Sequence, residues 1–206
     1  KRSGFVINQL SGGGCEHMGN FPTFPVKGKL KMSPDNILNY RINISEEKGH
    51  AGYYEAMVQE DIKAKLTVTE RTGMASYEYP ADQQYGTVII GGISATPIEQ
   101  AAIVITAPNK CEGYAEGGNF CGLRTPYKVY FVAEFDTDAL ESGTWKRNEL
   151  KPNTTFAEGE YSGVYFTFDV NKKKNIQYKI GVSYVSVENA RENLKAENTG
   201  WDFLQI

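Results

Sequence analysis

Short apolar runs separated by turn residues recur along almost the whole chain, and this feature constrains the fold more than any other. The runs of strand length are Gly52–Val58, Ala64–Thr72, Met74–Tyr79, Gly86–Ile90, Ala101–Thr106, Tyr127–Phe135, Gly163–Val170 and Ile176–Val187. Helical periodicity is nearly absent between them, which is typical of antiparallel sheets with hairpin and Greek-key connections. We therefore predict an all-β fold, an antiparallel two-sheet β-sandwich resembling a supersandwich.

Charge and hydropathy exclude two classes of partner. The chain has 22 basic and 25 acidic residues, a formal net charge of -3, so it carries no electrostatic footprint for nucleic acid. The one basic run, Lys172–Lys174, lies between two strand-like segments and is predicted to be a solvated hairpin tip. No apolar run reaches the roughly 18 residues of a membrane span. We expect neither nucleic-acid binding nor membrane insertion.

The end of the chain has a different pattern from the rest. Ser186 is a helix N-cap candidate, Glu188 follows in the first turn, and Ala190, Leu194 and Glu197 fall on one face. We predict one short C-terminal helix over residues 186–197. Because no repeat or low-complexity linker divides the chain, we expect residues 1–206 to form one domain, truncated at an N-terminus that shows no signal peptide.

Cysteine, histidine and paired acids offer little catalytic chemistry. Cys111 and Cys121 flank a Gly-rich segment and form either a disulfide across a hairpin or two buried free thiols. His17 and His50 have no partner at metal-ligand spacing. Glu134 and Asp136 lie two apart on a predicted strand, and we interpret them as a strand-end ion pair or a loop cap. We predict no catalytic residue and no metal ligand in this chain.

Several ordered blocks carry a resemblance to a known family. The longest is Tyr178–Ala190, which continues through Asn193-Leu194, Ala196-Glu197 and Gly200–Phe203. Earlier blocks in the same order are Gly4-Phe5, Leu10–Cys15, Gly19–Pro22, Gly52–Tyr54, Leu66–Gly73, Tyr79-Pro80 and Tyr127–Asp136. Together they cover nearly the whole chain, which resembles the N-terminal β-sandwich domain of glycoside hydrolase family 92.

The resemblance implies a function for a larger protein. Family 92 enzymes are calcium-dependent exo-α-mannosidases that invert the anomeric centre, with the general acid and base on a helical (α/α)6 domain. Inversion requires one carboxylic acid at the leaving oxygen and a separate carboxylate that activates water. The sequence shows neither arrangement, nor a calcium cluster. We expect a non-catalytic part of a secreted, periplasmic or cell-surface bacterial α-mannosidase that acts on a mannose-containing glycan, with helix 186–197 leading to the absent helical domain.

The Gly-rich segment from Leu10 to Pro22 is our candidate for substrate contact at the domain interface. Its glycines allow close approach of the backbone to a ligand, and polar side chains beside them suit sugar hydroxyls. The predicted substrate-binding residues are Gln9, Ser11, Gly14, Cys15, His17 and Asn20. The alternative is a tight buried turn in which Cys15 packs as a small apolar residue. The chain departs from the family in this segment, where many members have His at Ile7 or Gln9 and commonly Asp at Asn20.

Two other functions compete with this interpretation. A carbohydrate-binding module would use an exposed aromatic platform, for which Tyr53, Tyr54, Tyr85, Tyr114 and Trp145 are candidates. A cell-surface structural sandwich would use no sugar contact at all. The junction helix favours a continuing polypeptide over a complete module.

Overall fold

The chain folds into two antiparallel sheets that pack face to face. A computed structural model describes residues 4–8, 18–34, 43–91, 100–120, 122–203 and 206. Within them, 14 strands precede one helix. The elements are β1 (Thr23–Lys27), β2 (Ile44–His50), β3 (Tyr53–Val58), β4 (Ile62–Val68), β5 (Thr72–Glu78), β6 (Tyr85–Gly91), β7 (Gln100–Ala107), β8 (Lys110–Phe120), β9 (Leu123–Phe135), β10 (Glu141–Lys146), β11 (Glu149–Pro152), β12 (Phe156–Glu158), β13 (Ser162–Asp169), β14 (Asn175–Ser183) and α1 (Val187–Glu197).

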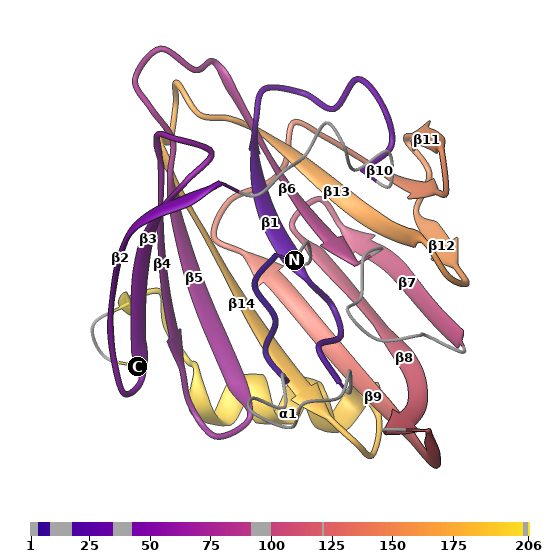
Figure 1. Cartoon of the computed structure of the whole chain (residues 1–206). Coiled ribbons are helices and arrows are strands. Elements are labelled where there is room, and N and C mark those ends of the chain that lie inside the picture. The colour runs from indigo at the N-terminus through magenta and orange to yellow at the C-terminus, as the bar shows by residue number, and fades with distance from the viewer. Residues whose placement is uncertain (1–3, 9–17, 35–42, 92–99, 121, 204–205) are drawn as a thin grey trace.

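The small sheet has the order β1-β6-β13-β10-β11, and the large sheet has the order β12-β7-β8-β9-β14-β5-β4-β3-β2. Figure 1 shows the large sheet as a broad row of strands, with β1 and the segment before it in front. Every strand pair is antiparallel among the pairings of the described residues. The predicted all-β sandwich with a short C-terminal helix is confirmed.

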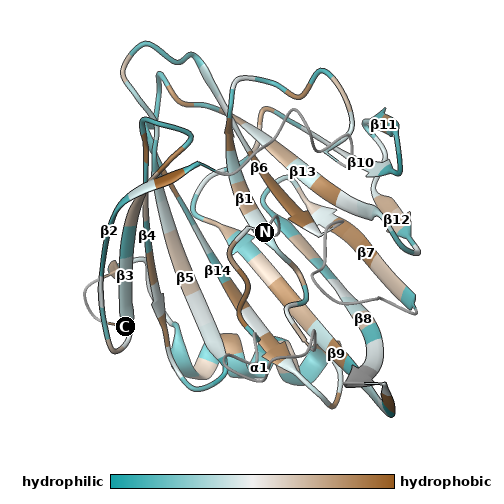
Figure 2. Ribbon diagram, viewed as in Figure 1, coloured by the Kyte–Doolittle hydropathy of each residue, from teal (hydrophilic) through white to brown (hydrophobic). Residues whose placement is uncertain are grey.

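The core fills the space between the inner faces of the two sheets. Phe135 of β9 contacts Phe166 and Phe168 of β13, with ring centroids 4.9 and 5.1 Å apart, so these three rings join the large sheet to the small one. Trp145 of β10 is fully buried in the same layer. Apolar residues recur along strands such as β6, β7 and β9, whereas the edge strand β2 is largely hydrophilic (Figure 2).

Several predicted strands have different ends in the structure. The run Ala64–Thr72 spans two strands, because β4 ends at Val68 and the chain turns before β5, with Thr69 N–H donating to Thr72 O over 2.9 Å. The run Ile176–Val187 is also too long, since β14 ends at Ser183. The strands β1, β2, β8, β10, β11 and β12 were not among the predicted runs.

The Gly-rich segment Glu112–Phe120 is a strand and not the hairpin that the disulfide alternative required. It forms most of β8, between β7 and β9 in the large sheet. A Cβ atom at Gly113 would collide with the backbone of Ala102 on β7, so glycine permits this close strand approach. Glycine in this strand serves sheet packing rather than a turn.

The basic run connects the two sheets instead of forming a hairpin tip. It follows β13 of the small sheet and precedes β14 of the large sheet. Lys172 is solvated, with 84% of its side chain exposed, while Lys173 Nζ lies 2.7 Å from a carboxylate oxygen of Asp136. The solvation of Lys172 was predicted correctly, but the prediction that the run forms the tip of a hairpin was wrong.

Helix α1 packs on the outer face of the large sheet. Ser186 Oγ accepts a hydrogen bond from Asn189 N over 3.1 Å, which confirms the predicted N-cap. Ala190 and Leu194 are buried against Val132 of β9. In Figure 1 the helix crosses the lower end of this sheet, behind β9 and β14. Within the described residues, no helix is long and apolar enough to cross a membrane.

Candidate functional site

The predicted sugar-contact segment is described only at its two flanks. Gln9, Ser11, Gly14, Cys15 and His17 lie outside the described residues. Residues 4–8 precede the segment, and residues 18–22 are its last five residues. The candidate site is therefore built from these flanks and from what they contact on the large sheet.

Aromatic and aliphatic side chains hold both flanks against the inner face of the large sheet. Phe21 packs on Phe131 of β9 with a ring-centroid distance of 4.2 Å. Phe5 stacks near Tyr77 of β5 at 6.4 Å. Phe5 and Thr23 also exchange backbone hydrogen bonds of 2.8 and 2.9 Å, which extends the small sheet by one bridge. The two flanks thus start from a rigid platform between the sheets.

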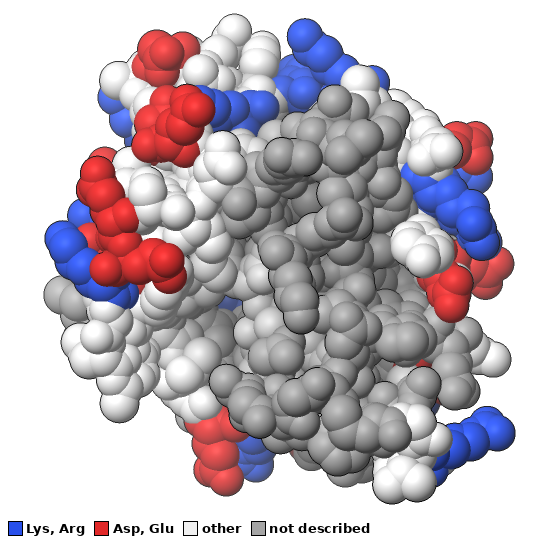
Figure 3. Space-filling view, in the orientation of Figure 1, with Lys and Arg blue, Asp and Glu red and all other residues white. Residues whose placement is uncertain are grey.

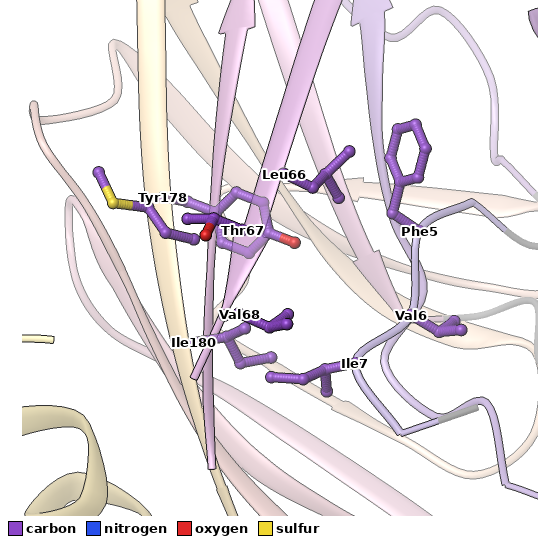
Figure 4. A pocket seen from close by; sticks show the side chains of 10 residues that line it. Phe5, Val6, Ile7, Leu66, Thr67, Val68, Tyr178 and Ile180 are labelled. Carbon is purple, nitrogen blue, oxygen red and sulfur yellow. The ribbon is translucent and has the colours of Figure 1, made fainter. Parts of the chain in front are cut away.

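A small apolar cavity of about 40 Å³ lies beneath the first flank. Figure 4 shows Ile7 pointing toward Val68 and Ile180 from the opposite wall. This volume is close to that of one water molecule and far below the several hundred cubic ångströms of a typical ligand site. The cavity is a packing gap and does not accommodate a sugar ring.

Asn8 and Asn20 close the base of the Gly-rich segment with reciprocal hydrogen bonds. Asn8 Nδ2 donates to Asn20 Oδ1 over 2.9 Å, and Asn20 N donates to Asn8 Oδ1 over 2.8 Å. The backbone adds Gly19 N to Asn8 O at 3.3 Å. Three hydrogen bonds therefore fix the two ends of the segment side by side.

Tyr127 of β9 ties this base to the large sheet. Its hydroxyl donates to Asn20 Oδ1 over 3.0 Å, so this oxygen accepts from two side chains. Gly117 on β8 makes room for the ring, since a Cβ there would lie 2.8 Å from the Tyr127 hydroxyl oxygen. The Tyr127 ring meets the Tyr184 ring edge-on at 6.5 Å, and the Tyr184 hydroxyl lies 3.6 Å from Met18 Sδ.

We call Asn8, Met18, Asn20, Tyr127 and Tyr184 the Asn20 cluster. Asn20 is fully buried, and its Nδ2 has no hydrogen-bond partner within the described part of the chain. Tyr184, by contrast, is 52% exposed and the adjacent Val185 is 74% exposed. The cluster thus has a buried polar base and an exposed apolar rim directly before α1. In the view of Figure 3, charged side chains of the described residues lie around the periphery of the face that carries the N-terminal flanks.

Chemically, the Asn20 cluster is a set of hydrogen-bonding and aromatic groups with no carboxylate among its members. It can hold a hydroxyl-rich ligand or a loop, and its members do not include the carboxylate pair that glycoside hydrolysis uses. Sequence reasoning selected Asn20 and missed Asn8, Met18, Tyr127 and Tyr184. The one available signal was that two asparagines flank the Gly-rich segment.

The acidic pair considered in the sequence forms ion pairs away from the Asn20 cluster. Glu134 lies 3.1 Å from Lys110 Nζ. Asp136 follows the end of β9, pairs with Lys173, and accepts from Gln177 N over 3.2 Å. The interpretation as strand-end ion pair and loop cap is confirmed for these contacts.

Cys111 is a buried free thiol, and burial raises its pKa. It lies at the start of β8, whose other end, Phe120, directly precedes Cys121. Nine residues of extended strand span roughly 30 Å, whereas a disulfide requires Cα atoms within about 7 Å. The extended strand therefore argues against the Cys111–Cys121 bond, although Cys121 itself lies outside the described residues.

Burial rules out one of the five aromatic candidates for a carbohydrate-binding platform. Trp145 is fully buried, so this candidate was wrong. Tyr53 is stacked by His50 at 5.2 Å, and Tyr54 donates to Glu47 over 2.8 Å. Lysine ammonium groups lie over two further rings, Lys29 over Tyr85 at 4.6 Å and Lys128 over Tyr114 at 3.8 Å. Each of the four remaining tyrosines already has a partner for its ring or its hydroxyl.

Metal ligands do not gather in the described part of the chain. Among those residues, no group of three or more His, Cys, Asp or Glu side chains is arranged to hold a metal ion. Calcium requires several carboxylate or carbonyl oxygens fixed together. The described residues therefore provide no carboxylate cluster that fits calcium.

Comparison with known proteins agrees with the architecture. A curated relative, an uncharacterized secreted glycosidase of Arthroderma benhamiae, is 24% identical, and the match covers 99% of this chain and 30% of that protein. A solved GH92 α-mannosidase of Bacteroides thetaiotaomicron matches with a TM-score of 0.84 and 24% identity over 98% of this chain and 29% of its own. An inverting GH92 mannosidase from strain VPI-5482 of the same species matches with a TM-score of 0.76 and 23% identity over 90% and 24%.

These matches span less than a third of each relative's length. At such identities the solved structures establish a shared fold. The family model described as "Glycosyl hydrolase family 92 N-terminal domain" matches residues 1–183, which is most of the sandwich. The chain belongs to the N-terminal domain family of the family 92 glycosyl hydrolases.

Proposed function

We propose that this chain is the substrate-holding, non-catalytic part of a secreted exo-α-mannosidase that inverts the anomeric centre. One observation carries the proposal: three hydrogen bonds between residues 8 and 19–20, together with Tyr127, pin the base of the Gly-rich segment. A segment held at both ends can present its polar groups to a sugar at low entropic cost.

In this proposal the segment faces the sugar, and the helical domain supplies the chemistry. Gln9, Ser11, Gly14, Cys15 and His17 contact sugar hydroxyls. Asn20 supports them from the base, where its Nδ2 is still an unpaired donor among the described residues. The general acid, the general base and the calcium ion belong to an (α/α)6 domain that follows α1. Support comes from the family match.

The exposed rim of the Asn20 cluster is the proposed contact with that domain. Tyr184 and Val185 are exposed and lie between β14 and the N-cap of α1. Burying such side chains at a domain interface is favourable by about 25 cal/mol per Å² of apolar area. We place the mannose-containing glycan between this rim and the helical domain, and the parent enzyme in the bacterial periplasm, at the cell surface or outside the cell.

A released-mannose assay with α-linked mannobiose tests the proposal. The 206-residue chain should release no mannose, whereas the protein from the complete reading frame should release mannose with inversion. In that protein, Asn20→Ala should raise KM more than it lowers kcat, because the base positions the substrate. Release of mannose by the 206-residue chain contradicts the proposal, as does a reading frame without a helical domain. Mannose binding by the isolated chain would instead favour a carbohydrate-binding module.

A further inference from the structure

A second polar site lies on the outer face of the large sheet, away from the Asn20 cluster. A pocket of about 150 Å³ opens between that face and the C-terminal end of α1. Glu134 of β9 and Lys179 of β14 form its floor, and Arg191, Lys195, Asn198 and Thr199 come from α1 and the residues after it. None of these residues was selected as a binding residue from the sequence.

Asn198 is the first sign that this pocket accepts a ligand. The residue is 1% exposed, and both Nδ2 and Oδ1 of its side chain are buried without a hydrogen-bond partner among the described residues. A buried amide with neither a donor nor an acceptor satisfied is unfavourable. No hydrogen bond holds the Asn198 amide in place. The side chain can therefore rotate toward the pocket without losing a hydrogen bond.

Lys179 is the second sign. It is only 7% exposed, and its Nζ donates to Asn198 O over 3.0 Å while lying 4.6 Å from the centre of the Trp201 ring. Capping the end of α1 in this way uses one of the three N–H groups of the ammonium. Within the described chain, no carboxylate lies within salt-bridge distance of Lys179. Burial lowers the pKa of Lys179, and the opposing effect of the Glu134 carboxylate does not outweigh it.

The charges around the pocket have a positive excess, although the whole chain carries a net charge of -3. Lys179, Arg191 and Lys195 face a single acid, Glu134. Glu134 is paired with Lys110 at 3.1 Å, and Arg191 is paired with Glu112 at 2.6 Å. Lys110 adds one positive charge and Glu112 adds one negative charge, so the positive excess is the same when these two partners are included. A water molecule would satisfy the Asn198 amide but would leave this charge unbalanced.

We propose that this pocket binds a small oxyanion that also carries a hydroxyl group, of which hydrogen phosphate is the simplest example. Its charged oxygens accept from Lys179 Nζ and Asn198 Nδ2, and its hydroxyl donates to Asn198 Oδ1. Arg191 and Lys195 add attraction at the rim. The proposal does not depend on sugar binding at the Gly-rich segment, because the two sites lie on opposite faces of the large sheet.

The test is a titration of the ¹⁵N-labelled chain with inorganic phosphate, followed by NMR at neutral pH. The side-chain amide of Asn198 and the backbone amide of Thr199 should shift and saturate, with a dissociation constant of about 1 to 10 mM. Sulfate at the same ionic strength should bind several-fold more weakly, because it has no hydroxyl at neutral pH. Acetate tests whether a carboxylate alone suffices, and it should also bind more weakly than phosphate.

Two variants and one control make the test specific. Lys195→Met removes an exposed charge at the rim and should weaken phosphate binding several-fold. Asn198→Asp places a negative charge in the pocket and should abolish binding. Lys172→Met, at a solvated lysine in a distant loop, should change nothing. The proposal is overturned if the Asn198 amide shows no saturable shift in the folded chain. It is equally overturned if phosphate and sulfate act alike and Lys195→Met has no effect.

Discussion

Asn8 and Asn20 lie twelve residues apart in the sequence and are joined by two hydrogen bonds, one of 2.9 Å between their side chains and one of 2.8 Å from Asn20 N to Asn8 Oδ1. The pair closes the Gly-rich segment at its base, and Tyr127 fixes Asn20 to β9. The interpretation of this segment as a substrate loop therefore depends on one asparagine pair.

Replacing Asn8 by alanine should destabilise the chain by about 1 to 3 kcal/mol, because Asn20 N loses its acceptor inside a buried site. Urea unfolding followed by tryptophan fluorescence measures the change, with Asn171→Ala in an exposed turn as the matched control. If both variants unfold at the same urea concentration, the hydrogen bonds between Asn8 and Asn20 do not stabilise the folded chain.

Glu197 anchors the end of α1 to the turn between β4 and β5. It accepts from Thr69 Oγ1 over 2.6 Å and from Arg71 N over 2.9 Å, and it pairs with Arg71 Nε. At neutral pH, Glu197→Gln should lower the free energy of unfolding by about 1 to 3 kcal/mol. Glu192→Gln, on the exposed face of the same helix, should have little effect.

The contribution of Glu197 should also depend on pH. Burial acts to raise its pKa, but the hydrogen bonds from Thr69 and Arg71 outweigh it and lower the pKa below its usual value. A carboxyl whose pKa is lower in the folded state stabilises above its unfolded pKa, near 4.3, and loses this effect as pH falls through the folded value. The difference between wild type and Glu197→Gln should therefore shrink below roughly pH 4. A constant difference down to lower pH would contradict this assignment.

Gly181 allows α1 to pack closely on the sheet. A Cβ at this position would lie 2.5 Å from Ala190 O and 2.8 Å from Leu194 Cβ. Gly181→Ala should displace the helix and cost about 1 to 3 kcal/mol or more. In Gly200→Ala the nearest atom would be 3.9 Å away, so this control should unfold like the wild type. Thermal unfolding followed by circular dichroism distinguishes the two variants, and equal midpoints would show that the helix tolerates the extra methyl group.

Cys111 should not react with thiol reagents in the folded chain. It is fully buried, and burial raises the pKa of its thiol, so the reactive thiolate is scarce even in mildly alkaline solution. Iodoacetamide labelling followed by peptide mass spectrometry should modify Cys111 only after urea unfolding. Rapid labelling of Cys111 under native conditions would mean that β8 opens readily or that the residue is not in the core.

The sequence by itself determined the class of fold and the elements that depend on local pattern. Apolar and polar residues alternate along Asp61–Thr69, which predicts a half-buried strand because side chains on a strand point to opposite faces in turn, and β4 lies within these bounds. Ser186 predicts the start of α1, because capping involves a side chain and an amide three residues away. The family blocks are also recognisable in the sequence, and they identify the domain.

Only the tertiary structure decided which residues meet. The asparagine pair, the contact of Lys179 with Asn198 and the burial of Trp145 join residues whose proximity follows from strand order and register. Local pattern states which face a residue occupies but not which strand lies opposite. For the same reason the sequence predicts a hairpin at Lys172–Lys174, where the structure has a connection between the two sheets, and it leaves a hairpin open at Glu112–Phe120, where the structure has strand β8. Glycine content and charge are properties of one segment. Which strands lie beside that segment depends on how the whole chain packs.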